Sequence, residues 1–179
     1  VSAEALPLSF EPANTVSPTA LSDAFNASFA DYLIAFPTLD TDGWRAFVQR
    51  QGVDLSASSI ACRGETVVAF ALITPRPAKR TRIAVMGARP EERGSGAAAQ
   101  LLDRAIAASD ARSDHWIELE AFAQNERAVR LYRSRGFEAA AELRGYVAPP
   151  GQGMARAAEA REVSPAEASR WAAAFDAER

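Results

Sequence analysis

The chain has 179 residues, 48% of them hydrophobic, which is enough for one domain with its own core and some excess. A net charge of −3 without any block of like charge excludes a strong electrostatic attraction to nucleic acid, so we expect no nucleic-acid partner. One cysteine and one histidine exclude an internal disulfide and leave a metal site almost without ligands, so we expect no bound metal.

The first residues and the hydropathy of the chain carry no sign of export or of membrane insertion. Residues 1–7 lack the basic start and the apolar core of a signal peptide. No apolar run reaches the roughly 18 residues that a membrane span needs. We therefore expect a cytoplasmic protein that has no membrane partner and acts on small molecules or peptides.

Two helices are predicted near the N-terminus, after a short strand over residues 8–10. Ser17 followed by Pro18 is typical of a helix start, and apolar residues then recur at three- and four-residue steps to about Tyr32. Pro37 is expected to end the segment that follows this helix. A second helix is expected from about Thr41. Its apolar positions are Trp44, Phe47 and Val48.

The middle of the chain predicts a β-hairpin over residues 59–62 and 66–73, and a third strand over 81–87. A helix to about residue 111, a strand over 116–123 and a helix capped by Asn125 follow. Gly136 is placed to end that last helix in a left-handed conformation, before a further strand region that opens at Phe137. This order of elements predicts an α+β (mixed α/β) fold, a mixed sheet flanked by helices.

The loop between the third strand and its helix has the composition of an anion site. Gly94 and Gly96 let the backbone approach a ligand, Arg93 adds a cation, and the following helix contributes the positive end of its dipole. The same stretch satisfies the dinucleotide pattern G-x-G-x-x-A, with Asp114 about 20 residues further on. The dinucleotide interpretation fits less well, because residues 87–92 separate the strand from the glycines and Asp114 precedes the next strand instead of closing it.

Two ordered motifs carry a resemblance to a known family. Arg93, Gly96 and Ala98 match R-x-x-G-x-A, and a later segment matches N-x-x-A-x-x-L-Y-x-x-x-G-F. The residues of the second match are Asn125, Ala128, Leu131, Tyr132, Gly136 and Phe137. Residues 79–146 thereby resemble the GNAT (acetyl-CoA-dependent N-acetyltransferase) superfamily. The resemblance implies a GNAT-like central mixed, mostly antiparallel sheet flanked by helices.

The resemblance also implies the reaction, the cofactor and much of the site. The chain would be an N-acetyltransferase that moves an acetyl group from acetyl-CoA to an amine by direct attack in a ternary complex, without a metal. Tyr132 would protonate the leaving thiolate, and Asn125 would help to hold the cofactor. Main-chain groups of Val85, Met86 and Gly87 would bind the pantetheine arm, and N–H groups near residues 86–88 would polarise the thioester carbonyl. The residues whose amides would hold the pyrophosphate are Arg93, Gly94, Ser95, Gly96, Ala97 and Ala98.

The resemblance does not supply a general base. Family members often carry a glutamate on the strand before the phosphate loop, and residues 81–86 contain none. Glu118 and Glu120 share one face of the next strand, so Glu120 is the catalytic candidate, acting through a water; a solvated strand face explains both residues equally well. An acceptor amine that loses its proton unaided is a further possibility. A non-catalytic acyl-CoA-binding or sensing module is therefore the alternative function, and a dinucleotide-binding oxidoreductase fragment ranks below both.

The acceptor would bind, by the same resemblance, between the helix-loop-helix near the N-terminus and the last strands. Tyr32, Phe36 and Tyr146 are the candidate substrate-binding residues. Asp31 and Asp40 could attract a cationic amine, although aspartates in such positions are ordinarily loop and cap residues. The sequence does not identify the amine.

Three segments are expected along the chain. They are an acyltransferase domain over residues 1–148, a linker over 149–163 and a C-terminal helix over 164–179. The helix begins at a capping box from Ser164 to Glu167, with Pro165 at the first helical position. Its apolar stripe must be buried against the same chain, against a second copy in a homodimer, or against a further domain.

Overall fold

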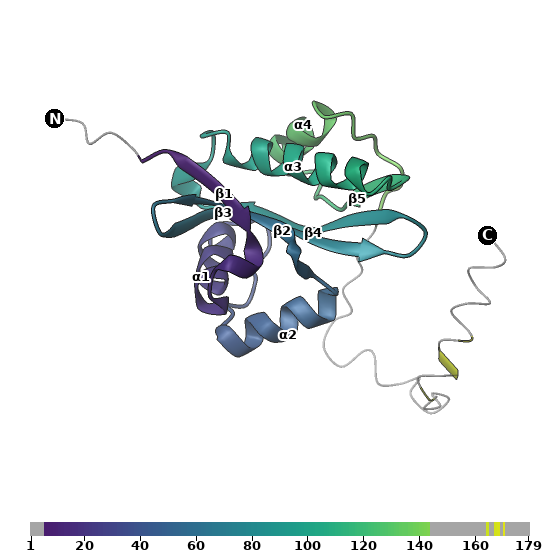
Figure 1. Cartoon of the computed structure of the whole chain (residues 1–179), viewed down its shortest axis with the longest axis horizontal. Helices are drawn as coiled ribbons and strands as arrows, with labels where there is room; N and C mark the ends of the chain where they lie inside the picture. The colour runs from purple at the N-terminus through teal and green to yellow at the C-terminus, as the bar shows by residue number, and fades with distance from the viewer. Residues whose placement is uncertain (1–5, 144–163, 165–166, 169, 171–179) are drawn as a thin grey trace. The chain divides into compact units, whose positions relative to one another are not determined.

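The computed structural model describes residues 6–143, 164, 167, 168 and 170. The chain divides into two compact units, Val1–Glu138 and Ala139–Arg179, and the elements described below belong to the first unit (Figure 1). None of the helices in this described part is long and apolar enough to cross a membrane.

A five-stranded sheet forms the middle of the first unit, with its strands in chain order. The strands are β1 (Leu8–Pro12), β2 (Asp54–Arg63), β3 (Thr66–Arg76), β4 (Arg80–Ala88) and β5 (Trp116–Leu119). The first four pair antiparallel with their neighbours, whereas β5 pairs parallel with β4. The predicted mixed, mostly antiparallel sheet is confirmed. This antiparallel pairing excludes a dinucleotide-binding fold, in which the strands of the sheet are mostly parallel.

Helices cover both faces of this sheet (Figure 1). On one face lie α1 (Pro18–Phe29) and α2 (Thr41–Gln51), and on the other lie α3 (Ala97–Ala111) and α4 (Glu126–Arg133). The short 3₁₀ turns η1 (Ala13–Thr15) and η2 (Pro90–Glu92) precede α1 and α3. The Ser17 hydroxyl accepts a hydrogen bond from the Ala20 N–H (3.1 Å), and the Asp40 carboxylate accepts one from the Gly43 N–H (2.7 Å). Both helices on the first face therefore begin at side-chain caps.

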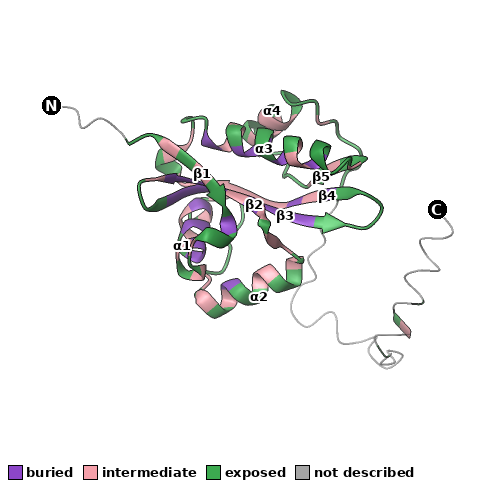
Figure 2. Cartoon of the chain, in the orientation of Figure 1, coloured by how far each residue is buried: buried purple, intermediate pink, exposed green. Residues whose placement is uncertain are grey.

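β3 lies at the centre of the core. Its residues are buried continuously from Val67 to Thr74, as a strand covered on both faces requires (Figure 2). Phe70 belongs to the cluster that contains Phe25 of α1 and Trp44 of α2, whereas its neighbour Ala71 belongs to the cluster with α3. The alternation of side chains along β3 thus fixes α1 and α2 on one face and α3 on the other.

The elements predicted up to the helix capped by Asn125 are present, but several boundaries differ from the prediction. α1 ends at Phe29 instead of Tyr32, and the hairpin strand predicted over 59–62 begins at Asp54. β5 ends at Leu119 instead of residue 123, because it pairs with only four residues of β4 and a strand needs a partner.

The strand region expected at Phe137 is wrong for the residues described up to 143. Gly136 does end α4 with a left-handed φ of +83°, as predicted. The Phe137 N–H then donates to the Tyr132 carbonyl (3.2 Å), and the rings of these two residues lie 6.0 Å apart. These contacts form the Schellman closure of a helix and turn Phe137 back onto α4. Residues 138–142 are glutamates and alanines, which are depleted in strands.

The second unit is described at four residues beyond 143. There the Ser164 hydroxyl accepts a hydrogen bond from the Glu167 N–H (3.2 Å), and the Ala168 N–H donates to the Ser164 carbonyl (2.9 Å). Both bonds are those of a helix start at Ser164. The predicted linker over 149–163 and most of the predicted C-terminal helix lie outside the described residues.

Candidate functional site

The edge of β4 that faces β5 is only partly paired. The parallel pairing joins Arg80 through Ile83 to β5, while the rest of β4 continues to pair with β3 alone. The Arg89 N–H donates to the Val68 carbonyl of β3 (2.9 Å). Because main-chain groups alternate in direction along a strand, those of Gly87 and Val85 also face β3, and those of Met86 and Ala88 face the open edge. Of the three residues expected to bind pantetheine, Met86 is the one whose main chain is available.

Gly87 has a packing role that the sequence did not reveal. A Cβ at this position would lie 2.9 Å from Cζ of Phe70 and 3.1 Å from Cβ of Ser28. Both distances are too short for carbon atoms in contact. The glycine therefore allows α1 to pack directly onto β4.

The loop before α3 presents unpaired N–H groups at a helix N-terminus. Gly94 and Gly96 have φ values of +94° and +89°, which side chains rarely permit. Amides that find no acceptor among the described residues are those of Gly94, Gly96, Ala98 and Ala99. The remaining loop amides donate locally, from Arg93 to the Pro90 carbonyl (3.2 Å), from Ser95 to the Glu92 carbonyl (3.1 Å) and from Ala97 to the Ser95 hydroxyl (3.3 Å). The structure thus divides the six predicted pyrophosphate ligands into amides that are free and amides that shape the loop.

An ion pair with β2 holds the start of this loop in place. The Glu92 carboxylate accepts hydrogen bonds from the Arg63 guanidinium at 2.5 and 2.9 Å, and these bonds lower the pKa of Glu92. Arg63 also donates to the Leu6 carbonyl. The ion pair therefore anchors the start of the loop to the sheet, and the two glycines that follow are exposed.

Arg93, expected to be the cation of the phosphate site, is bound to the end of α1. Its guanidinium donates to both oxygens of the Asp31 carboxylate, each at 2.6 Å, and to the Ser28 carbonyl (3.1 Å). Hydrogen bonds from Arg93 lower the pKa of Asp31. The carboxylate considered as a binder of cationic amines is therefore already paired with a cation.

The structure brings together three predicted site residues beside α4. They are the cofactor-binding candidate Asn125, the substrate-binding candidate Tyr32 and the catalytic candidate Tyr132. The Asn125 side chain caps α4 by accepting a hydrogen bond from the Ala128 N–H (3.2 Å), and it donates to the Tyr32 hydroxyl (3.3 Å). Tyr132 lies half-buried among the apolar residues between α3, α4 and the sheet. Burial, together with the nearby Tyr32, raises the pKa of Tyr132 to about 12. The phenol of Tyr132 is consequently neutral and able to donate at any physiological pH.

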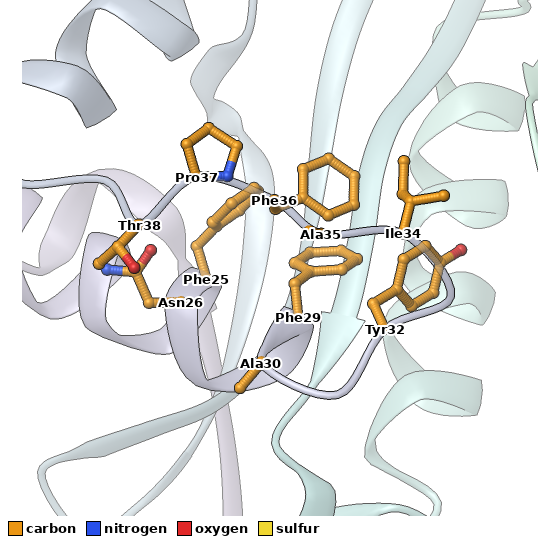
Figure 3. Close-up of a pocket in the computed structure, with 10 residues that line it drawn as sticks. All are labelled: Phe25, Asn26, Phe29, Ala30, Tyr32, Ile34, Ala35, Phe36, Pro37 and Thr38. Atoms are coloured by element: carbon orange, nitrogen blue, oxygen red, sulfur yellow. The ribbon is translucent and has the colours of Figure 1, made fainter.

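A cavity of about 410 Å³ lies beside Tyr32, between the end of α1 and the loop that leads to α2 (Figure 3). Tyr32 and Phe36, two of the predicted acceptor residues, line it; Tyr146 lies outside the described residues. Phe25 and Phe29 also contribute to the wall. Sequence reasoning missed these two as pocket residues, because their spacing on α1 is that of an ordinary core face.

Glu120, the candidate base, is an exposed residue just after β5. Its carboxylate lies 3.5 Å from a guanidinium nitrogen of Arg82, whose other terminal nitrogen donates to the Gln51 side chain (3.1 Å). A carboxylate in this position must leave Arg82 before it can take up a proton. The Arg82 side chain of this pair is only 16% exposed, so separating the pair leaves a shielded guanidinium with the Gln51 side chain as a partner.

The comparisons with known proteins agree with this arrangement. The family model for the acetyltransferase (GNAT) family matches residues 20–137. No curated protein matches the sequence. Among solved structures, the chain is similar to yncA from Salmonella typhimurium, solved with its cofactor acetyl-CoA (19% identity, TM-score 0.58, covering 73% of this chain and 79% of that one).

Two other solved structures have a similar fold. One is an N-acetyltransferase from Staphylococcus aureus Mu50, with 19% identity and a TM-score of 0.63, covering 75% of this chain and 86% of that one. The other is the ribosomal-protein-S18-alanine N-acetyltransferase from Escherichia coli, with 18% identity and a TM-score of 0.60, covering 75% and 80%. At these identities the likeness shows a common fold.

Proposed function

This chain belongs to the GNAT acetyltransferase family, and we propose that it transfers an acetyl group from acetyl-CoA to an amine within a ternary complex. The observation that carries the proposal is the set of unpaired amides in the loop before α3, next to the open edge of β4. The N-acetyltransferases among the similar folds support an amine as the acceptor. The alternative is an acyl-CoA-binding module without turnover.

The chain offers groups for the pyrophosphate and for the pantetheine arm of acetyl-CoA. The pyrophosphate would be held by the amides of Gly94, Gly96 and Ala98 at the positive end of α3, where the two glycines leave room for close approach. The pantetheine amides would extend the hydrogen bonding of the sheet at the open edge of β4, through Met86 and Ala88. When bound, the thioester would supply an activated acyl carbon.

Tyr132 would donate a proton to the departing thiolate. A thiol pKa of about 8.5 lies roughly 3.5 units below that of the phenol at about 12, a gap of about 5 kcal/mol for full proton transfer. The burial that raises the pKa of Tyr132 would raise the pKa of a thiolate placed beside it, and so narrow this gap. Tyr132 would act first as a hydrogen-bond donor and complete the transfer as the thiolate develops.

Deprotonation of the amine would fall to Glu120 through a water, or would precede binding. Glu120 is exposed and paired with Arg82, so a base role requires that the pair opens. Replacing Glu120 with Gln distinguishes the routes: lower turnover with a changed pH profile supports the base, and unchanged turnover supports an amine that binds already neutral. The pairing of Glu120 and the lack of a glutamate before the phosphate loop also favour the non-catalytic alternative.

The test combines ligand binding with turnover in the Tyr132→Phe variant. Acetyl-CoA at 100 times its dissociation constant is expected to stabilise the fold by about 2.7 kcal/mol in thermal melts, with NAD(P) as the inactive control. Thiol release with a panel of amines then reports turnover, and Tyr132→Phe is expected to lower it roughly 10- to 10⁴-fold with nearly unchanged acetyl-CoA affinity. Full activity of Tyr132→Phe would remove this residue from the mechanism. Binding without thiol release from any amine would favour the non-catalytic module.

A further inference from the structure

The described residues that line the cavity beside Tyr32 carry no charged side chain. Ten of the described residues line it, and none of these ten is an acid or a base: four have aromatic rings, and the others are two alanines, isoleucine, proline, asparagine and threonine (Figure 3). The four aromatic residues are Phe25, Phe29, Tyr32 and Phe36. The volume of about 410 Å³ falls within the range of roughly 300–1,000 Å³ that is usual for small-molecule sites. The four rings in this wall offer an aromatic group a surface against which it can pack, beside polar atoms of the same wall.

Three polar side chains at or near this wall, Asn26, Asp40 and Asp31, are already engaged. The Asn26 amide donates to the Leu39 carbonyl (2.8 Å) and accepts from the Leu39 N–H (2.9 Å). Asp40 caps α2, and Asp31 is paired with Arg93. A cationic group placed in the cavity would therefore lose its water without finding an unpaired carboxylate among the described lining residues, which is unfavourable.

The rim of the cavity exposes large apolar side chains. Ile34 and Phe36 are 45% and 40% exposed, although the ring of Phe36 lies only 5.1 Å from that of Phe29. Clustered apolar exposure of this kind is typical of a surface that a ligand covers. The rings of this wall pack edge to face against one another. Such packing leaves ring faces on which the aromatic ring of a ligand can stack.

The same cavity is connected to the proposed reaction centre through Tyr32. Its ring forms part of the wall, while its hydroxyl accepts the hydrogen bond from Asn125 and lies close enough to Tyr132 to raise the pKa of that phenol. Building on the proposed function, we infer that the acceptor is a primary amine that carries an uncharged aromatic group, with the ring in this cavity and the amine beside Tyr32. Polyamines and other amines with a second positive charge would be poor acceptors.

The test compares 2-phenylethylamine with 1,4-diaminobutane as acceptors, by thiol release from acetyl-CoA. The expected result is a kcat/KM at least tenfold higher for the aromatic amine. Phe36→Ala should raise the KM for 2-phenylethylamine roughly 10- to 100-fold with little change in kcat, because it removes wall area that is buried equally in ground and transition states. Leu33→Ala, which truncates an exposed apolar neighbour outside the lining, is the matched control and should change neither constant.

A binding measurement separates failure of this inference from failure of the proposed function. Calorimetric titration of 2-phenylethylamine into the protein with bound coenzyme A should show binding that Phe36→Ala weakens and Leu33→Ala does not. Thiol release that is as efficient with 1,4-diaminobutane would overturn the aromatic preference and leave the acetyltransferase intact. Aromatic binding without thiol release from any amine would support the cavity assignment and contradict the catalytic function.

Discussion

Ser28 is a buried polar residue at the contact between α1 and β4. Its hydroxyl is buried and has no hydrogen-bond partner among the described residues, and its Cβ packs against Gly87. Leaving a buried hydroxyl unpaired costs about 1–3 kcal/mol. Ser22, on the same helix and equally buried, donates to the Thr19 carbonyl (3.0 Å). The two serines are therefore a matched pair that differs in one hydrogen bond.

Ser28→Ala is expected to raise the free energy of unfolding by about 1 kcal/mol, because it removes an unsatisfied group and only one packed atom. Ser22→Ala should lower it by about 0.5–1.5 kcal/mol, because it removes a hydrogen bond that is made. Urea unfolding of both variants checks the difference. A loss of similar size in both would mean that the Ser28 hydroxyl has a partner after all.

The roles of some site residues could be predicted from the sequence, and those of others could not. Tyr132 and Asn125 could be predicted because they sit at fixed spacings within a motif, and Asn125 also occupies a recognisable helix cap. The partner of Arg93 could not be predicted. Asp31 lies 62 positions away, and an ion pair across that separation leaves no periodic signal in either segment. Phe29 is hidden for a different reason, since a pocket wall and a core face have the same helical spacing.

At the scale of elements, the turn after α1 ties together both loops of the proposed site. Asp31 binds Arg93 of the phosphate loop, and the next residue, Tyr32, bonds to Asn125 at the start of α4. The rings of Tyr32 and Phe122 lie 6.0 Å apart, which adds a contact to the segment between β5 and α4. A change in either loop therefore acts on the residues that line the acceptor cavity.

Asp31→Asn is expected to increase the affinity for coenzyme A about twofold to fivefold, because the partly exposed ion pair no longer competes for Arg93. The KM for the amine should rise at the same time, since the turn that carries Tyr32 loses a tether. Fluorescence or calorimetric titration with coenzyme A, combined with steady-state kinetics, measures both changes. Asp42→Asn removes an exposed carboxylate paired with Arg45 on α2 and is the control without effect. Weaker coenzyme A binding in Asp31→Asn would show instead that Asp31 orients Arg93 toward the anion.

The order and type of the elements up to α4 could be predicted from the sequence, whereas several of their ends and the conformation after Phe137 could not. Ser17, Asn125 and Gly136 mark helix boundaries by local chemistry, and the structure places these boundaries where their caps predict. The ends of β5 and of α1 depend on partners elsewhere in the chain. β5 ends where it separates from β4, which continues to Ala88, and the turn after α1 is held by Arg93, so neither end has a local signal.

Across the whole molecule, ion pairs and hydrogen bonds to carboxylates connect elements that are distant in sequence. The Asp114 carboxylate accepts hydrogen bonds from Thr81 of β4 (2.7 Å), from Ser109 of α3 (3.2 Å) and from the Arg112 guanidinium (3.1 Å). It thereby joins the end of α3 to the start of the parallel pairing between β4 and β5. Hydrogen bonds, mainly to neighbouring arginine and hydroxyl groups, lower the pKa of several such carboxyl groups. They are Asp31, Asp54, Glu92, Asp103 and Asp114.

These lowered pKa values determine how stability should depend on pH. A carboxyl group with a lower pKa in the folded state stabilises the fold above its unfolded pKa of about 4, and this contribution disappears as the pH falls through the folded value. The free energy of unfolding should therefore stay nearly constant between about pH 7 and pH 5 as far as these groups are concerned, and decrease steeply below about pH 4. Urea unfolding at several pH values measures the curve.

Asp114→Asn isolates the contribution of the carboxylate with the most side-chain partners in this network. The variant should be less stable than the parent chain at pH 7, because Arg112 loses its charged partner, and the two curves should approach each other as the pH falls, because protonation removes the same charge from the parent. Asp110→Asn, which changes an exposed aspartate in the last turn of α3, should follow the parent curve throughout. If the Asp114→Asn and parent curves instead ran parallel from pH 7 to about pH 3, the hydrogen bonds of Asp114 would not depend on its charge. The junction between α3 and the parallel strand pair would then owe its stability to packing around Thr81 and Ser109, both of which are buried.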